Sequence, residues 1–174
     1  ESILLKEGYS TIVCDFKEDP GLEEKKLQFL FDKMVDGIVL MPLPGNDNLV
    51  KKIIARKTSL VLIDRMINNV ECDVVLVDNL NASYNAVEQL IIRGHRRIGI
   101  IAGPQNIYTA QERLKGYIRV LEDYGLKVDP SLIKHGDYQI ESGYNLLLEL
   151  MKIEQPPTAV YVTNYEMTIG SIIA

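Results

Sequence analysis

The stretch RGHRRIGIIAGP, residues 93–104, carries the strongest structural signal in this chain of 174 residues. A helical pattern that precedes it stops at Gly94, and the apolar residues 98–102 then predict a short buried strand. The Gly-Pro pair that follows leads into ERLKGY, residues 112–117, which places Arg113 near the start of the next helix. Loops of this kind lie at the carboxyl ends of parallel strands, where α/β proteins bind small ligands. The stretch therefore predicts an α/β unit with a polar binding crevice.

Short apolar runs alternate with helical patterns along the rest of the chain. The runs are rich in Val, Ile and Leu, which is typical of parallel strands covered on both faces. The expected strands are Ser10–Cys14, Gly37–Met41, Leu60–Ile63, Asp73–Val77, Arg97–Ala102 and Ala159–Thr163. Their alternation with helices predicts an α/β fold with doubly wound parallel sheets.

The helical patterns repeat apolar residues at the spacing i, i+3, i+4, i+7, which places them on one buried face. The first of these helices begins at Asp19-Pro20, an N-cap followed by a first-turn proline. The predicted buried faces are Leu27, Leu30, Phe31 and Met34; Leu49, Val50, Ile53 and Ile54; Tyr84, Val87, Leu90 and Ile91; Leu114, Tyr117, Ile118 and Leu121; and Tyr144, Leu147, Leu148 and Met151.

One connection is too short for a crossover helix. The eight residues Arg65–Cys72 suit either a turn around Asn68-Asn69 or an excursion at a sheet edge. We expect a boundary just after the next strand, which divides the chain into subdomains 1–79 and 80–174. Both ends of the sequence cut through helical patterns, so we expect it to be a piece of a longer protein.

The overall composition limits the possible functions. The formal net charge is −5, and 47% of the residues are hydrophobic, as in ordinary globular proteins. An acidic chain of this kind is not expected to bind the phosphate backbone of a nucleic acid. No apolar run approaches the length of a membrane span. Cys14 and Cys72 have no framework spacing, which favours a reducing cytoplasm.

Six collinear segments resemble the lactose-repressor (LacI/GalR) family of bacterial transcription regulators. These segments are residues 35–42, 61–65, 77–79, 93–104, 112–117 and 157–160 together with Asn164. The resemblance implies a periplasmic-binding-protein-like type I fold, incomplete at both ends, in which two subdomains close on a small sugar-like effector. It also implies a homodimer, and operator DNA bound through a helix-turn-helix head that lies outside this segment.

The resemblance places two charged residues in the effector crevice. Arg113 corresponds to an arginine that holds effector hydroxyls or a carboxylate, and its planar fork suits bidentate contacts. The alternative is a surface arginine that pairs with Glu112 or Glu122. Asp64 ends a buried strand, where a carboxylate needs partners. It either accepts ligand hydroxyls or bonds backbone amides of its own turn.

Further candidates are less charged. Asn164 ends the last strand and can donate and accept together, although it is equally suited to cap the following helix. Tyr138 matches an aromatic position that stacks on the effector ring, or it is a partly exposed loop residue. Thr109 and, more weakly, Tyr108 are candidates of the same class. At Asp78 and Asn79 we expect capping near a hinge rather than ligand contact.

The remaining polar residues indicate no metal site, no cofactor site and no enzyme active site. The two histidines and two cysteines lack metal-ligand spacing. We expect His95 to complement a helix end or to bond a neighbouring carbonyl, and the arginine cluster at 93, 96 and 97 to do the same. No phosphate-binding glycine loop or nucleophile elbow is present in the sequence.

We therefore expect a cytoplasmic transcription regulator, a repressor controlled allosterically by its effector. The alternative is a periplasmic sugar-binding protein that feeds a transporter. The residues that precede this segment would discriminate the two, by showing a DNA-binding head or a signal peptide.

Overall fold

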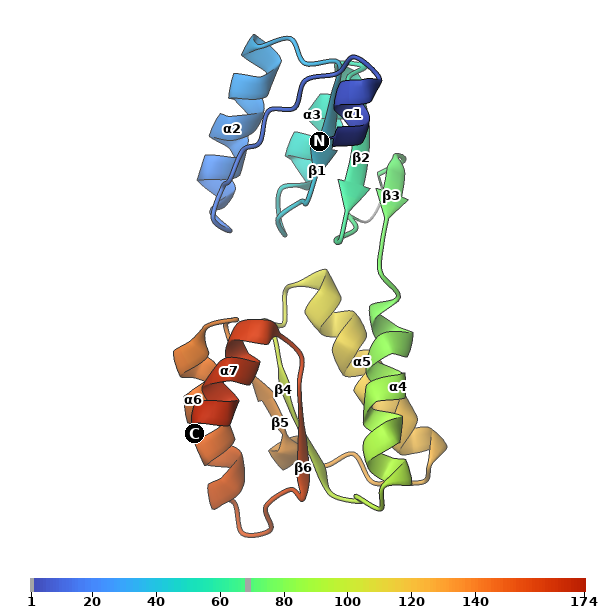
Figure 1. Cartoon of the computed structure of the whole chain (residues 1–174), viewed down its shortest axis with the longest axis vertical. Helices are drawn as coiled ribbons and strands as arrows, with labels where there is room; N and C mark the ends of the chain where they lie inside the picture. The colour runs from blue at the N-terminus through green and yellow to red at the C-terminus, as the bar shows by residue number, and fades with distance from the viewer. Residues whose placement is uncertain (1, 68–69) are drawn as a thin grey trace. The chain divides into compact units, whose positions relative to one another are not determined.

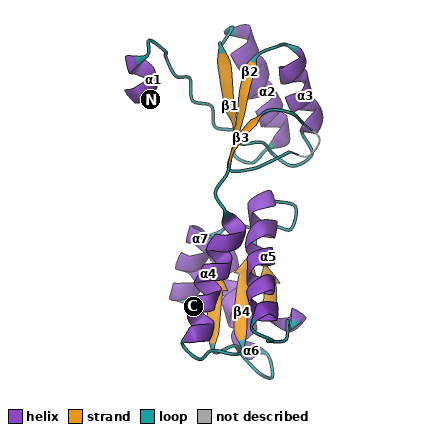
Figure 2. Ribbon diagram, turned by 90° about the vertical axis from the view of Figure 1, so that its right-hand side faces the viewer, coloured by secondary structure: helices purple, strands orange, loops and turns teal. Residues whose placement is uncertain are grey.

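The computed structural model describes residues 2–67 and 70–174. The chain divides into two compact units, the first ending at Val75 and the second beginning at Leu76. Each unit contains its own parallel sheet (Figures 1 and 2). The boundary expected after Asn79 lies just inside the second unit.

The first unit is built from a three-stranded sheet and helices. In chain order its elements are α1 (Ser2–Lys6), α2 (Pro20–Asp32), β1 (Gly37–Leu40), α3 (Asp47–Ala55), β2 (Ser59–Ile63) and β3 (Asp73–Val75). The strands pair in the order β1-β2-β3 and all run parallel. Asp19 caps α2 as predicted, because its side chain accepts a hydrogen bond from the Leu22 amide at 2.9 Å.

Helices cover one face of this sheet. Ile38 and Leu40 of β1 pack with Leu60 and Leu62 of β2 in a core that α2 and α3 complete. The opposite face includes Val39, which is 65% exposed, and α1 contributes no buried residue. Among the described residues of this unit, the packed core therefore lies on one face of the sheet.

Several local predictions fail in the first unit, and Ile54, expected on the buried face of α3, is 37% exposed. Residues Ser10–Cys14 form no strand, and Val13 within them is 88% exposed. A strand needs a neighbour for its backbone hydrogen bonds, and the described residues provide none here. Met34, expected on the buried face of α2, lies beyond the helix with a φ of +52° and is 87% exposed. Helix α2 has already ended at Asp32.

Strands β2 and β3 are parallel neighbours although no helix in the described residues joins them. The connection between these two strands is short, and its residue Ile67 packs into the core at 8% exposure. The turn expected at Asn68-Asn69 lies outside the described residues.

The second unit repeats the alternation of helices and strands. Its elements are α4 (Asn79–Ile92), β4 (Ile98–Ala102), α5 (Tyr108–Asp123), the 3₁₀ turn η1 (Pro130–Leu132), β5 (Ile133–His135), α6 (Ile140–Lys152), β6 (Ala159–Val162) and α7 (Tyr165–Ile173). The parallel sheet has the order β5-β4-β6, so the apolar residues 98–102 of the stretch RGHRRIGIIAGP form its central strand. The short strand β5 was not predicted.

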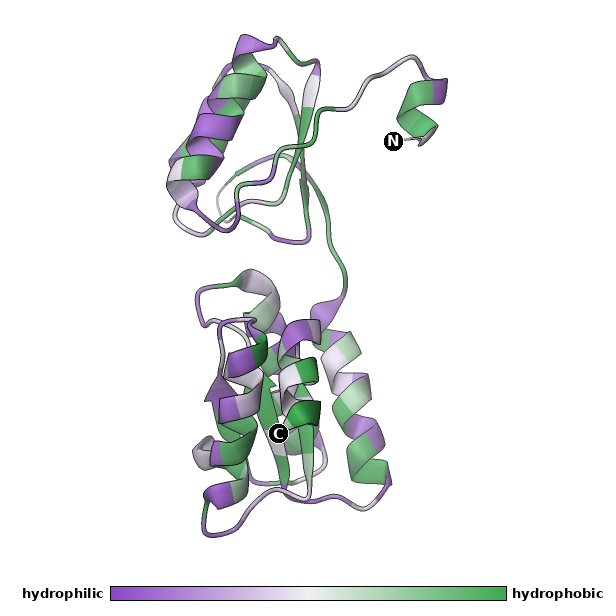
Figure 3. Cartoon of the chain, turned by 60° about the vertical axis from the view of Figure 1, so that its left-hand side comes forward, coloured by the Kyte–Doolittle hydropathy of each residue, from purple (hydrophilic) through white to green (hydrophobic). Residues whose placement is uncertain are grey.

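Both faces of the second sheet are covered, as predicted. Ile98 and Ile100 of β4 face a core shared with α4 and α5. Ile101, whose side chain points the other way, packs with Leu150 of α6 and Met167 of α7. The helices present alternating hydrophilic and hydrophobic residues around their circumference (Figure 3). This burial makes β4 the apolar centre of the unit.

The helix ends in the second unit follow the sequence signals, but one helix face does not. Gly94 ends α4 with a φ of +96°, and the His95 amide bonds the Leu90 carbonyl in a C-terminal cap. In α6, the expected face is rotated, since Tyr144 and Met151 are exposed. The buried residues of α6 are Gly143 and Leu150, because the helix crosses α7 closely at that glycine.

Among the described residues, no helix combines the length and apolar character needed to cross a bilayer.

Candidate ligand-binding site

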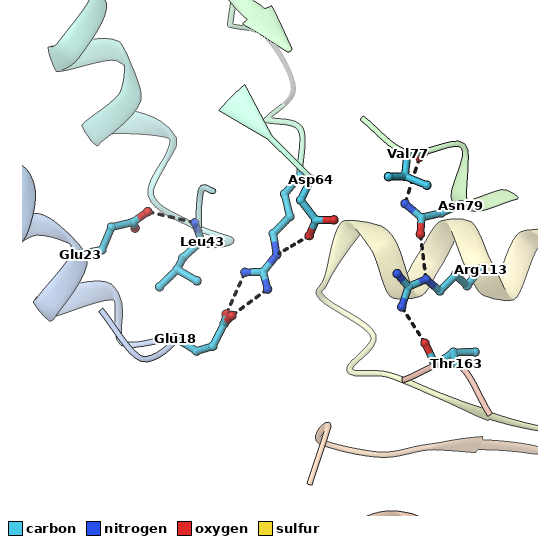
Figure 4. Close-up of polar contacts among 9 residues, drawn as sticks. Glu18, Glu23, Leu43, Asp64, Val77, Asn79, Arg113 and Thr163 are labelled. Atoms are coloured by element: carbon cyan, nitrogen blue, oxygen red, sulfur yellow. Dashed lines mark hydrogen bonds and ion pairs between the residues drawn. The ribbon is translucent and has the colours of Figure 1, made fainter. Parts of the chain in front are cut away.

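Arg113 is held at the carboxyl edge of the second unit's sheet. It lies in the second turn of α5, where its Nε donates to Oδ1 of Asn79 at 2.8 Å and its Nη1 donates to the carbonyl of Thr163 at 2.7 Å. Figure 4 shows the guanidinium between these two acceptors. The alternative pairing with Glu112 or Glu122 is not seen, and Glu112 instead accepts a bond from Lys115 at 2.6 Å.

The two acceptors are themselves fixed. Asn79, at the start of α4, is 4% exposed, and its Nδ2 donates to the Val77 carbonyl at 3.1 Å. Thr163, directly after β6, is 7% exposed and its hydroxyl donates to the Ile101 carbonyl. A guanidinium held by two buried acceptors presents its remaining N–H groups in a defined orientation.

Two other predicted residues come from the same edge of the sheet. Thr109 lies one helical turn before Arg113 on α5, hence on the same face, and is 4% exposed. Asn164 caps α7, because its Oδ1 accepts a bond from the Met167 amide at 3.0 Å. The cap engages the amide oxygen, so ligand contact by this residue would involve its amide nitrogen. The weaker candidate Tyr108 is the first residue of α5 and is half-buried.

Tyr138 follows β5 and is half-buried, with a φ of +70°. Its ring packs against the core formed by β4, α6 and α7. It also lies against Gly103, where a Cβ atom would overlap the ring. The absence of a side chain at position 103 therefore makes room for this aromatic ring just beyond the end of β4.

Asp64 belongs to the first unit, where it follows β2 with a φ of +63° and a half-exposed side chain. Its amide donates to the Val75 carbonyl at 3.0 Å. Its Oδ2 lies 3.9 Å from Nε of Arg65. Arg65 in turn donates to both carboxylate oxygens of Glu18. The turn that carries Asp64 is thus tied to the segment that precedes α2.

Glu23 is a buried carboxylate of the first unit. It is 1% exposed and accepts hydrogen bonds from the Leu43 amide, at 3.1 Å, and from the Asn46 side chain. Burial raises its pKa, and these two hydrogen bonds oppose the rise only in part. Its partners lie in the loop after β1, so Glu23 holds that loop against α2 (Figure 4).

The basic cluster near the start of β4 has structural partners. Arg96 donates to the carbonyls of Ile91 and His95, as expected at a helix end. Arg97 pairs with Asp129 at 2.8 Å, across the unit. His95 bonds the hydroxyl of Thr158 at 2.9 Å, rather than a carbonyl. Within residues 2–67 and 70–174, no group of His, Cys, Asp and Glu side chains is arranged to hold a metal ion.

Two hollows of the second unit lie near the strand ends. One, of about 260 Å³, is lined by Gly103, Gln105, Ala110, Gln111, Leu114 and His135. The other, of about 600 Å³, lies at the start of α6 and includes Asp137, Glu141 and Glu166. Neither is lined by the predicted ligand residues, although the first adjoins α5 directly beside Thr109.

The sequence reasoning missed the partners of the two charged candidates. Capping near a hinge was expected at Asp78 and Asn79, and Asp78 does cap α4 through the Asn81 amide. The bond between Asn79 and Arg113 was not expected. The main-chain carbonyl of Thr163 accepts the second bond from Arg113, and no side-chain pattern reveals this role. Glu18 lies 47 residues from Arg65, so only the fold brings them together.

Comparisons with known proteins agree with this architecture. Residues 3–174 match the family described as periplasmic binding proteins and sugar binding domain of LacI family. The chain is 31% identical over 167 residues to the transcriptional repressor CytR of Escherichia coli K12, covering 95% of this chain and 48% of that protein. It is 32% identical over 171 residues to the repressor PurR of Pasteurella multocida, covering 97% and 51%. The chain thus spans about half the length of these curated relatives.

Solved structures give the same result. The transcription regulator CcpA of Lactococcus lactis is matched with a TM-score of 0.88 at 27% identity, over 99% of this chain and 63% of that chain. A complex of the transcriptional regulator CelR with cellobiose is matched with a TM-score of 0.88 at 28% identity, over 99% and 53%. The chain therefore belongs to the LacI family and has the periplasmic-binding-protein-like fold of that family's core.

Proposed function

We propose that this chain is the effector-sensing core of a bacterial LacI-type repressor. The effector is a small polar molecule, a sugar or a sugar derivative. Its binding shifts the population of core conformations. This shift changes the affinity of a DNA-binding head for the operator. The core performs no covalent chemistry on the effector.

The observation that carries this proposal is the fixed guanidinium of Arg113. It lies at the carboxyl edge of a parallel sheet, where ligands of α/β proteins bind, and two buried acceptors orient it. A pre-oriented fork loses little conformational entropy when a hydroxyl or carboxylate oxygen binds it. This arrangement supports the assignment of Arg113 as the main ligand contact.

The other candidates supply the chemistry that a sugar requires. Asp64 offers carboxylate oxygens as acceptors, and Asn164 and Thr109 offer an amide and a hydroxyl. Tyr138 offers an aromatic plane against which a ring packs. The sugar class is also supported by the solved complex of CelR with cellobiose, a family member of similar fold.

A regulator is favoured over a transporter's binding protein by the relatives. CytR and PurR, which match almost the whole chain, are both named as transcriptional repressors. The negative net charge of this chain fits a division in which DNA is bound elsewhere in the protein. Homodimer formation and a cytoplasmic location complete the proposal.

The ligand assignment is tested by calorimetry. A thermal-shift screen with D-ribose, D-glucose, cellobiose and adenosine identifies a binding compound, because binding to the folded state raises the unfolding midpoint. Arg113→Ala should then raise its Kd by at least about tenfold, since hydrogen bonds to a charged donor contribute about 1.5–3 kcal/mol.

Arg119→Ala is the matched control on the same helix. Arg119 is exposed and lies 3.8 Å from Asp123, away from the acceptors of Arg113. This variant should bind like the parent chain. Equal titrations for Arg113→Ala and the parent would refute the site, provided that circular dichroism shows both to be folded.

The regulatory role is tested with DNA. A protein that joins this chain to its DNA-binding head should retard a promoter fragment in a gel, with an affinity that falls as salt rises. The 174 residues alone should not do so. Tight DNA binding by this chain alone would overturn the division of labour, and a signal peptide in the intact gene product would favour the transporter alternative.

A further inference from the structure

The side chain of Asn79 makes hydrogen bonds that are not needed to cap α4. Asp78 already caps this helix, since its carboxylate accepts from the amide of Asn81 at 3.1 Å. The same interaction lowers the pKa of Asp78. Asn79 nevertheless is 4% exposed, and both ends of its side-chain amide are engaged. Helix capping therefore does not explain the two hydrogen bonds of this buried side-chain amide.

The two partners of Asn79 determine which way its amide points. Oδ1 faces Nε of Arg113, which can only donate, and Nδ2 faces the carbonyl of Val77, which can only accept. Figure 4 shows Asn79 between these two groups. An aspartate at this position could still accept from Arg113 but could not donate to Val77, and an alanine could do neither.

The bond from Asn79 fixes one edge of the Arg113 guanidinium. A second bond, to the Thr163 carbonyl, takes part of Nη1. These two bonds restrain the plane of the guanidinium, which has one further N–H group on Nη1 and two on Nη2. Thr163 follows β6, and Asn79 begins α4. Arg113 therefore contacts both of these elements.

We propose that Asn79 is a positioning residue for ligand recognition at Arg113, and that it links Arg113 to the segment Leu76–Asp78. Through this segment the chain passes from the first compact unit to the second. The proposal rests on the proposed function in one respect, the ligand contact by Arg113. The orientation of Arg113 by Asn79 is independent of any ligand.

The orientation is tested first without a ligand, by NMR of the arginine Nε–H group. The Arg113 resonance is assigned by its loss in Arg113→Lys. In the parent chain, its exchange with water should be slow, because the proton is bonded to Asn79. Asn79→Ala should speed this exchange by about tenfold, since a hydrogen bond from a charged donor is lost. Asn79→Asp should keep the exchange slow, because a carboxylate accepts the same bond.

Asn81→Ala is the matched control. Asn81 lies two residues further along α4, and its side chain bonds Asp78. It should leave Arg113 exchange unchanged. If Asn79→Ala does not fold, Asn79→Ser, whose hydroxyl is too short to reach both partners, takes its place. Slow exchange of Arg113 in the alanine or serine variant would overturn the proposal.

The consequence for recognition is tested with the compound that binds among D-ribose, D-glucose, cellobiose and adenosine. Asn79→Ala should raise its Kd by about tenfold, and Asn79→Asp should restore most of this loss. A purely structural role would lower the unfolding midpoint of both variants without this difference in affinity. If none of the four compounds binds, the proposed ligand class fails, while the exchange experiment still decides the positioning role.

Discussion

Arg65 donates from both terminal nitrogens of its guanidinium to the two carboxylate oxygens of Glu18, at 2.8 and 2.7 Å. The arginine side chain is only 9% exposed, whereas that of Glu18 is 57% exposed. A mostly buried cation depends on its counter-charge, because burial removes the water that would otherwise solvate it.

Replacement of Glu18 by glutamine should therefore destabilise the first unit. We expect a loss of about 1–3 kcal/mol in the free energy of opening at Leu62, measured by native-state amide exchange. The control is Lys52→Met, which removes an exposed pair with Glu24 at 3.6 Å. That change should cost less than about 0.5 kcal/mol. Equal effects of the two substitutions would contradict the importance of the Arg65 pair.

Gly170 lies where α7 crosses α6. A Cβ atom there would overlap the carbonyl oxygen of Ile140 and lie 2.8 Å from the Tyr144 amide. These are backbone atoms, which cannot rotate away, so Gly170→Ala should lower the unfolding free energy of the second unit by about 1–3 kcal/mol. Urea denaturation followed by circular dichroism measures this loss. Ile172→Ala, at an 80% exposed position of the same helix, should remain close to the parent.

Tyr117 is fully buried, and its hydroxyl donates to the Ile98 carbonyl at 2.7 Å. Tyr117→Phe should reduce stability by about 1 kcal/mol, because the Ile98 carbonyl loses its side-chain donor while the ring still fills the core. Burial also raises the pKa of Tyr117 to about 12, so the substitution should remove a late-titrating tyrosine from an alkaline spectrophotometric titration. Tyr165→Phe, at a 75% exposed position, should leave the core stability unchanged.

The lowered pKa of Asp129 predicts that the stability of the second unit depends on pH in the acid range. The Ser131 hydroxyl and the Arg97 guanidinium both donate to its carboxylate, and they lower its pKa from 3.8 to about 2. Because the ionised form is favoured in the folded state, its stabilisation is present above pH 3.8 and is lost as the pH falls towards 2. Asp129→Asn should flatten the decline of stability in this window. Asp123→Asn, which affects a more exposed pair with Arg119, should not.

Much of the helical structure could be predicted because its signals are local. Asp19 starts α2 through a bond to an amide three residues away. Gly94 and Gly125 end helices with φ values of +96° and +65°, which a residue without a Cβ adopts readily. Such features depend on a few neighbouring residues, so a single sequence is enough to find them.

The predictions that failed depend on distant neighbours. Ser10–Cys14 has the composition of a strand, but a strand forms only beside another one, and composition does not name that partner. The rotated face of α6 has the same origin, because the approach of α7 at Gly143 decides which residues are covered. Periodicity identifies an apolar face but not the surface that packs on it.

By itself, the sequence determined the alternation of strands and helices, most helix ends, the family, and the candidates Arg113, Asp64, Asn164, Tyr138 and Thr109. Only the tertiary structure decided which polar groups meet. Asn79 and Arg113 lie 34 residues apart, and Glu18 and Arg65 lie 47 apart. The physical reason is that helix caps and periodicity act over a few residues, whereas a buried hydrogen bond depends on which segments the hydrophobic cores bring together.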